Sequence, residues 1–228
     1  MTLSDRDLTL DDLQNGYFVY QFRDGFRFGA DAVLLSDFAD IRKDETVVDL
    51  GCGTGIIPML LLAKGKGSVF TGIELQEDYV KLAKKSVSYN SVEDRIRIIQ
   101  ADIKEAERIL GKGNFDVCVS NPPYLAKNDG KHSPDDAKAF ARHEIACDFA
   151  DVARTAAKLI KGNGRFYLIH RPHRLGAIMS ELIKNRLEPK RMRLVYPHID
   201  ESPVMVLIEA VRGAKSGLVI EKPYIMYE

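Results

Sequence analysis

The sequence predicts an α/β fold in which helices cover both faces of a mostly parallel sheet. From residue 46 onward, short β-branched runs alternate with helical stretches, an order typical of parallel sheets. A glycine-rich turn follows the first of these runs, and the last two predicted strands have a short connection, which favours an antiparallel strand at one edge. At 228 residues the chain is long enough to bury one sizeable core.

Seven strands and five helices account for the alternation. The predicted strands cover residues 46–50, 69–75, 96–101, 115–120, 165–170, about 191–196 and 204–211. The predicted helices cover residues 55–64, 77–90, 104–110, 139–160 and 174–186. Val80, Ala83 and Val87 lie three to four positions apart in the second helix, as one buried face requires. The helix over 139–160 is expected to stop at Gly162 and Gly164, and the tail from residue 218 to fold back as an extended segment.

Residues 1–40 do not follow the alternation of strands and helices that the rest of the chain shows. The stretch GYFVYQFRDGFRFGADAVLL (16–35) predicts a small hairpin with a turn at Asp24-Gly25, followed by a helix from about Asp31. We therefore expect an amino-terminal extension over residues 1–40 and a main domain over residues 41–228.

Charge and cysteine content restrict the possible environments. The formal net charge is zero, but residues 151–228 hold 14 Lys and Arg against 8 Asp and Glu, a net +6 that suits either a polyanion or a solvated surface. Cys52, Cys118 and Cys147 are widely spaced and indicate buried thiols, without disulfides or a metal site. The amino terminus lacks signal-peptide character and the longest apolar run, 56–63, is too short for a bilayer, so we expect a cytoplasmic protein without membrane contact.

The stretch VVDLGCGTG (47–55) places three glycines between a predicted strand and a helix. Such a turn lets a nucleotide-like ligand approach the backbone closely. A dinucleotide would require G-x-G-x-x-G, whereas the spacing here is G-x-G-x-G, which favours S-adenosylmethionine. Glu74, at the end of the second strand, could accept ribose hydroxyls of either cofactor. Asp102, after the third strand, favours S-adenosylmethionine because it can accept from an adenine amino group.

The stretch SNPPY (120–124) ends the fourth predicted strand with two prolines. In a doubly wound sheet this segment and the glycine loop would face each other across one crevice. The Asn121 side-chain oxygen and the Pro122 carbonyl could then accept from a planar amine that becomes positive on methylation. Tyr124 could stack on the base, and Pro123 would stiffen the loop. The alternative is a tight loop that merely ends a strand.

With these motifs, the chain resembles the class I S-adenosylmethionine-dependent methyltransferases that carry Asn-Pro-Pro-Tyr, over roughly residues 15–228. Within them it is most similar to the bacterial tRNA1(Val) adenine-N6 methyltransferase family, on FRFGADAVLLSDFA (26–39), SNPPY and the closing KPYIMYE. The resemblance implies a Rossmann-like, seven-stranded, mostly parallel sheet with an antiparallel edge strand.

The resemblance also implies roles for individual residues. Residues 1–40 would cover the donor, with Asp31 contacting its methionine amino group, and Asn121, Pro122, Pro123 and Tyr124 would form the acceptor site. The methionine end of the donor would lie against Asp49, Gly51, Gly53 and Gly55, its ribose against Glu74, and its adenine against Asp102 and Ile103. Leu75 and Asn121 are further candidates for contacts with the donor.

The substrate implied is an adenine in tRNA, beside the anticodon of tRNA1(Val). Three alternatives stay open: a glutamine amide of a release factor, a guanine N2 of rRNA, and a cofactor-binding RNA-interaction module without catalysis. Glutamine-methylating relatives usually carry a separate helical amino-terminal domain, and only 45 residues precede the first strand here, which favours RNA. Arg171 and Arg174 are candidates for phosphate contacts, and Lys190, Arg191 and Arg193 could extend a basic track. The oligomeric state is open, and a monomer is compatible with the sequence.

Overall fold

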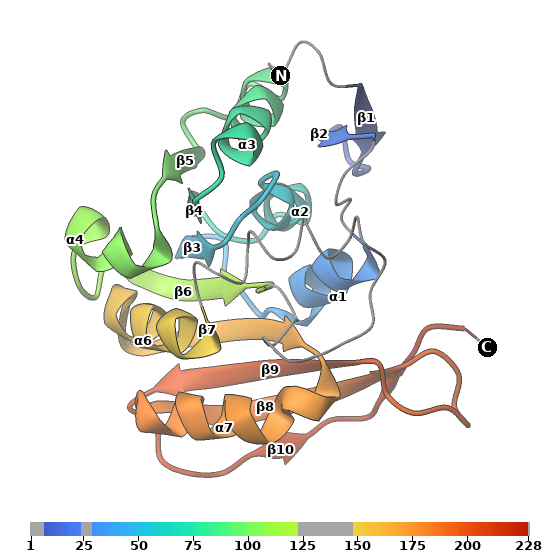
Figure 1. The fold of residues 1–228 in the computed structure, drawn as a ribbon, viewed down its shortest axis with the longest axis vertical. Helices are drawn as coiled ribbons and strands as arrows, with labels where there is room; N and C mark the ends of the chain where they lie inside the picture. The colour runs from blue at the N-terminus through green and yellow to red at the C-terminus, as the bar shows by residue number, and fades with distance from the viewer. Residues whose placement is uncertain (1–6, 24–28, 123–147, 228) are drawn as a thin grey trace.

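The computed structural model describes residues 7–23, 29–122 and 148–227 (Figure 1). A hairpin, β1 (Leu8–Asp12) and β2 (Phe18–Phe22), precedes a large sheet with helices on both of its faces. The strands of the large sheet are β3 (Thr46–Leu50), β4 (Val69–Glu74), β5 (Ile96–Gln100), β6 (Phe115–Ser120), β7 (Ile160–His170), β8 (Leu187–Tyr196), β9 (Met205–Arg212), β10 (Val219–Ile220) and β11 (Tyr224–Ile225). The α-helices are α1 (Ala30–Phe38), α2 (Ile56–Ala63), α3 (Glu77–Tyr89), α4 (Ala106–Leu110), α6 (Phe149–Leu159) and α7 (Leu175–Lys184), with 3-10 turns η2 (Ile103–Glu105) and η3 (Pro172–Arg174).

The sheet order confirms the predicted doubly wound architecture. The order is β10-β8-β9-β7-β6-β3-β4-β5, and β3 pairs in parallel with both β4 and β6. The order therefore reverses between the first and fourth predicted strands, as expected. Among the described residues the sheet has nine strands instead of seven, because the tail adds β10 and β11, both parallel to β8.

The antiparallel strand is not at the edge of the sheet, where we expected it. β9 is antiparallel to both β7 and β8 and lies between them. The short connection from β8 to β9 is therefore a hairpin whose return strand inserts next to β7, and β8 lies between β9 and the short strands β10 and β11. Strand β9 is buried over its first six residues, all of them apolar except Glu209, which suits a covered position better than an edge.

Two apolar layers hold the helices against the sheet. One layer joins α1, α2 and α3 to one face, and the other joins α4, α6 and α7 to the opposite face (Figure 1). Helix α2, IIPMLLLA, is buried over its first seven residues because the sheet, α1 and β2 surround it. Among the described residues, no helix is long and apolar enough to span a bilayer.

The connection from α6 to β7 differs from the prediction. The helix ends at Leu159, and the strand starts at Ile160 and runs through both glycines that were expected to separate them. The register slips here, with Phe115 opposite Ile160 but Val117 opposite Arg165. A Cβ on Gly164 would lie 2.9 Å from the Ile160 Cβ, so glycine permits a bulge inside the strand. Of the helix predicted over 139–160, residues 139–147 lie outside the described residues.

The amino-terminal hairpin forms one strand earlier than expected. β1 pairs antiparallel with β2, and Gln14, Asn15 and Gly16 between them have positive φ (68°, 55° and 83°). The turn is thus at Asn15-Gly16, a pair suited to that conformation. The Asp24-Gly25 pair lies outside the described residues.

The hairpin and α1 are fastened to the main domain. The Phe18 N–H donates to the Asn90 Oδ1 (2.9 Å) and the Tyr20 N–H to the Ser86 Oγ (2.9 Å), so β2 hydrogen-bonds to α3. Lys66 Nζ donates to the carbonyls of Ser36 (2.8 Å) and Ala39 (2.6 Å) at the end of α1. Helix α1 is therefore held in the same core as α2, while the domain boundary at residue 40 stays a prediction.

Candidate active site

The glycine loop between β3 and α2 has the backbone that its sequence predicts. Gly51, Gly53 and Gly55 all have positive φ (78°, 53° and 78°), a backbone conformation that residues other than glycine rarely adopt. The N–H groups of Gly51 and Cys52 both donate to the Ile73 carbonyl (2.9 and 3.0 Å). The loop is therefore held against β4 at the carboxyl edge of the sheet.

Glu74 ties the glycine loop to the end of β4. Its Oε2 accepts from the Gly53 N–H (3.0 Å) and its Oε1 from the Gln76 N–H (2.8 Å), while only 3% of the residue is exposed. Each carboxylate oxygen can accept more than one hydrogen bond. Glu74 can thus shape the loop and still accept from a ligand.

Asp49 is a second buried carboxylate of the site. It is 1% exposed, and neither of its side-chain oxygens has a hydrogen-bond partner among the described residues. Burial raises the pKa of Asp49 well above its ordinary value, and the charge of Glu74 raises it further. An unsatisfied buried carboxylate is unfavourable in the free protein, so it points to a cationic or hydrogen-bond-donating ligand.

An apolar surface and a carboxylate lie beside the loop, where an adenine ring was predicted. Leu75 is 43% exposed, and the Ile103 Cδ1 lies 3.9 Å from where a Gly51 Cβ would be. Asp102 caps η2 by accepting from the Lys104 N–H (2.9 Å), and its side chain is 31% exposed. A flat ring could thus lie on apolar atoms with an acceptor at its edge.

Asn121 follows β6 directly and faces the neighbouring α1. The Ser120 hydroxyl donates to the Leu50 carbonyl (2.7 Å), which fastens the end of β6 to the end of β3. The Asn121 Nδ2 donates to the Asp31 Oδ2 (2.8 Å), and Pro122 is buried. Pro123 and Tyr124 lie outside the described residues.

The end of β7, next to β6, is strongly basic. His170 is the last strand residue and is 4% exposed. Burial, Arg174, His173 and Arg171 lower its pKa to about 4, so it is neutral near pH 7, and its Nδ1 accepts from the Arg171 N–H (2.8 Å). His170 ends the predicted strand 165–170, but burial of its side chain was not predicted.

The suggested basic track along β8 is wrong for two of its three members. Arg191 pairs with Glu209 and Glu221 (both 2.7 Å), and Arg193 Nε donates to the Glu221 Oε2 (2.9 Å). Arg191 also lies over the Phe38 ring, 4.7 Å from its centroid. These arginines therefore hold the carboxyl-terminal tail and α1. The sequence alone cannot reveal this role, because Glu221 lies 30 residues from Arg191 and 28 from Arg193.

The fold brings the predicted residues to one edge of the sheet. Asp49 to Gly55, Glu74 and Leu75, Asp102 and Ile103, and Asn121 follow or end the four parallel strands β3, β4, β5 and β6. Sequence reasoning missed the contact between Asp31 and Asn121, which are 90 residues apart. Among the described residues, no cluster of three His, Cys, Asp or Glu side chains could hold a metal ion.

This fold and site define a methyltransferase. The chain belongs to the methyltransferase small domain family, whose model matches residues 23–185. Curated relatives are tRNA1(Val) (adenine(37)-N6)-methyltransferases, which confirms the resemblance drawn from the motifs. The protein from Porphyromonas gingivalis W83 is 30% identical over 78% of each chain. The one from Tolumonas auensis is 30% identical over 67% of this chain, but the match spans only 62% of that relative.

Solved structures confirm the class I methyltransferase fold. A predicted O-methyltransferase from Agrobacterium tumefaciens superposes with a TM-score of 0.69 at 26% identity, covering 86% of this chain and 87% of that one. Geranyl diphosphate C-methyltransferase from Streptomyces coelicolor superposes with a TM-score of 0.58 over 79% of each chain, at 18% identity. The second similarity concerns the fold alone.

Proposed function

We propose that this protein uses S-adenosylmethionine to methylate N6 of an adenine in tRNA. The observation that carries the proposal is Asn121, whose amide lies at the end of β6, on the strand next to the glycine loop of β3. An amide at that place can accept from an exocyclic amine. The relatives are named for the same reaction.

The residues present fit S-adenosylmethionine. The donor carries positive charge on its sulfur and its amino group, and Asp49 supplies a buried carboxylate with no partner among the described residues. Asp49, Gly51, Gly53 and Gly55 would hold the methionine end, and Glu74 the ribose. Asp102, Ile103 and Leu75 would hold the adenine. When bound, the donor supplies a methyl group on a positively charged sulfur, which a neutral nitrogen can attack.

The protein's own contribution is to position the amine and stabilise its developing charge. The Asn121 Oδ1 and the Pro122 carbonyl would accept from the amine hydrogens as the nitrogen becomes positive. Pro123 would stiffen the segment and Tyr124 would stack on the base, an interaction worth about 1 to 3 kcal/mol in comparable sites. A general base is unnecessary because the product ammonium is acidic enough to lose a proton to water.

The cationic end of β7 supports a nucleic-acid substrate. Arg171, His173 and Arg174 lie just past the strand that pairs with β6, where phosphates flanking a flipped base could lie. We place the target beside the anticodon of tRNA1(Val), after the names of the relatives. A tRNA-modifying enzyme would work in the cytoplasm. Residues 1–40 would cover the donor, which the domain formed by residues 41–228 would bind. No metal is required by this chemistry.

The test is transfer of labelled methyl from S-adenosylmethionine to total tRNA from a strain that lacks this gene, followed by nucleoside mass spectrometry. N6-methyladenosine is expected. N2-methylguanosine, or label only in release factor, would contradict the adenine proposal. Asn121→Ala should lower turnover about 100- to 1,000-fold with donor affinity nearly unchanged, by analogy with the loss of one donor from an oxyanion hole. An unchanged rate would mean that Asn121 does not contact the reacting amine.

A further inference from the structure

We propose that Asp31 is a positioning residue that orients the Asn121 amide so that its oxygen, and not its nitrogen, meets the substrate. This inference rests on the proposed function and deepens it. It identifies the contact by which the acceptor site selects a group that carries N–H hydrogens.

The Asp31 carboxylate is held from both sides. Its Oδ1 accepts from the N–H groups of Gly29 (3.1 Å) and Ala32 (2.9 Å) at the start of α1, and its Oδ2 accepts from the Asn121 Nδ2 (2.8 Å). The residue is only 9% exposed, so solvent contributes little to these contacts. One oxygen is thus committed to the helix and the other to the acceptor-site amide.

The chemistry of this pair decides which way the amide points. A carboxylate only accepts hydrogen bonds, whereas an amide both donates, through nitrogen, and accepts, through oxygen. Turning the Asn121 amide over would place its oxygen 2.8 Å from a carboxylate oxygen, with no hydrogen between them. The nitrogen therefore faces Asp31, and the oxygen is directed to the other side.

The prolines cannot supply this orientation. Pro122 restricts the backbone, but the terminal torsion of an asparagine is broad and roughly two-fold. An inverted amide would present N–H groups to a substrate amine that also carries hydrogens, which is unproductive. With the oxygen presented, the site accepts an amino or amide group and disfavours a bare carbonyl oxygen, such as O6 of guanine.

Helix α1 gives Asp31 a rigid base. Lys66 binds the carbonyls at the far end of the helix, and Leu35 and Phe38 pack in the core. The carboxylate thereby reaches the acceptor site from an element 90 residues earlier in the chain. This role differs from a contact with the donor's methionine amino group, and the two predict different defects.

Asp31→Asn tests the orientation with an isosteric change. The two helix N–H groups should keep the new amide oxygen in place, which puts its nitrogen opposite Asn121 and forces the Asn121 amide to invert. Turnover on tRNA should fall about 100-fold, close to the effect of Asn121→Ala, with the Kd for S-adenosylmethionine within about twofold of wild type. Asp37→Asn, which removes a carboxylate from the exposed end of the same helix, is the matched control and should leave turnover unchanged.

Exchanging the two residues tests the direction of the hydrogen bond. Asn121→Asp alone places two carboxylates together and should abolish turnover. Combined with Asp31→Asn, the new Asn donates to the new Asp, whose second oxygen can accept from the substrate, so at least a tenfold recovery is expected. A Kd for the donor weakened tenfold or more by Asp31→Asn at unchanged turnover would overturn the inference in favour of a donor contact. Unchanged turnover with an unchanged Kd would also overturn it.

These outcomes are separate from failure of the proposed function. If wild-type protein does not methylate tRNA but methylates another amine, the same variants on that substrate decide the role of Asp31. If it methylates tRNA and Asp31→Asn is neutral, the proposed function stands and the orienting role of Asp31 is rejected.

Discussion

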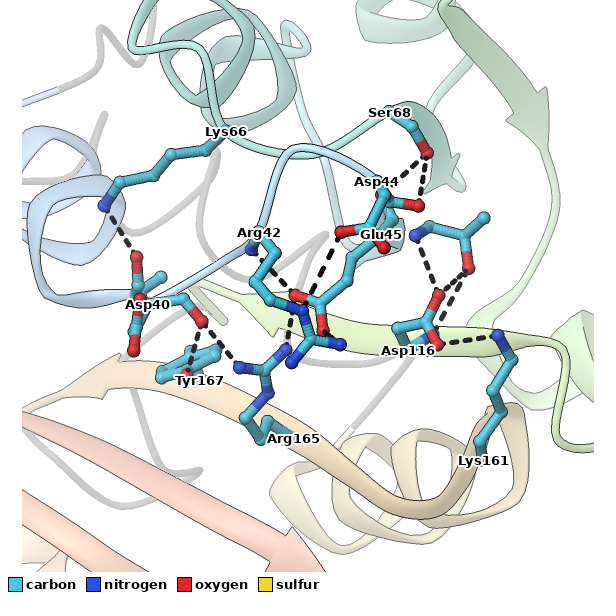
Figure 2. A network of polar contacts seen from close by, with 12 residues as sticks. Asp40, Arg42, Asp44, Glu45, Lys66, Ser68, Asp116, Lys161, Arg165 and Tyr167 are labelled. Carbon is cyan, nitrogen blue, oxygen red and sulfur yellow. Dashed lines mark hydrogen bonds and ion pairs between the residues drawn. The ribbon is translucent and has the colours of Figure 1, made fainter.

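The amino and carboxyl ends of the parallel strands differ in how their carboxylates are paired. At the amino ends of β3 and β6, the buried Glu45 and the half-buried Asp116 of the network in Figure 2 are both paired within the protein. At the carboxyl ends, Asp49 has no partner among the described residues and three glycines hold positive φ. The amino edge therefore serves stability, whereas the carboxyl edge keeps a buried carboxylate without a partner in the described part of the chain and a glycine loop of rare backbone conformation, as a binding site would.

The amino-end network is centred on Glu45, which is 3% exposed. Arg165 pairs with its Oε2 and Arg42 Nη2 lies 2.7 Å from its Oε1. Arg165 Nη1 and the Tyr167 hydroxyl donate to the Asp40 carbonyl (2.9 and 3.0 Å; Figure 2). The network thus fastens the segment between α1 and β3 to β7.

The largest stability effect should come from breaking this network. Glu45→Gln leaves Arg165 partly buried without its carboxylate and should lower the free energy of unfolding by about 3 kcal/mol. Urea denaturation measures the loss, and methyl transfer per folded molecule should not change. Asp44→Asn, 84% exposed at the side chain, is the control and should change stability by less than about 0.5 kcal/mol. A loss no larger than that of the control would mean that the network is not stabilising.

His170 should make the carboxyl edge sensitive to acid. Its folded pKa of about 4 lies below the ordinary 6.5, so the unfolded chain binds a proton first as pH falls. The contribution of His170 to the free energy of unfolding is fully present above pH 6.5. It is lost as the pH falls toward 4, by at most about 3 kcal/mol. Urea denaturation across this range should show the decline in wild type and a smaller one in His170→Gln. Equal declines in the two proteins would refute the assignment.

Asp49→Asn should separate stability from ligand binding. Because burial and Glu74 raise the pKa of Asp49, the unfolded state ionises at lower pH than the folded state, and the folded protein loses stability as pH rises above 3.8. The variant should therefore gain about 1 kcal/mol at neutral pH. Its affinity for S-adenosylmethionine should fall at least about tenfold, the equivalent of 1.4 kcal/mol. Urea denaturation measures the change in stability, and calorimetric titration measures the affinity for the donor. A destabilised variant with normal donor affinity would contradict both the predicted gain in stability and the predicted loss of affinity.

The smallest effect should come from the exposed side of the amino-end network. Burial alone would raise the pKa of Asp116, but hydrogen bonds from Lys161 and Thr46 lower it to about 2. Lys161 is half exposed, so Lys161→Met should cost no more than about 0.5 kcal/mol, and less in high salt. Thr46→Val, which removes a 2.8 Å hydrogen bond to the same carboxylate, should cost about 1 kcal/mol at any salt. A reversed ranking in urea denaturation would contradict this.

Most of the main sheet was predictable because its cues are local. The strands β3 to β6 and the helices between them follow from short apolar runs and their periodicity, and the glycine spacing places the loop. The Asn15-Gly16 pair is an equally local turn signal, but the turn was predicted at Asp24-Gly25. Gly162 and Gly164 by themselves predict a break, because the bulge depends on the pairing of β7 with β6, which brings the Asp116 carbonyl close to Gly164.

By itself, the sequence determined the class of fold and the residue types that come together at the carboxyl edge of the sheet, where it predicts a ligand site. Only the tertiary structure decided that β9 inserts between β7 and β8, that Arg191 and Arg193 hold the tail instead of a phosphate, and that Asp31 meets Asn121. The physical reason is the range of the interactions. Periodicity and turn preferences act within a few residues, whereas the pairing of buried polar groups depends on which distant elements the sheet order brings together.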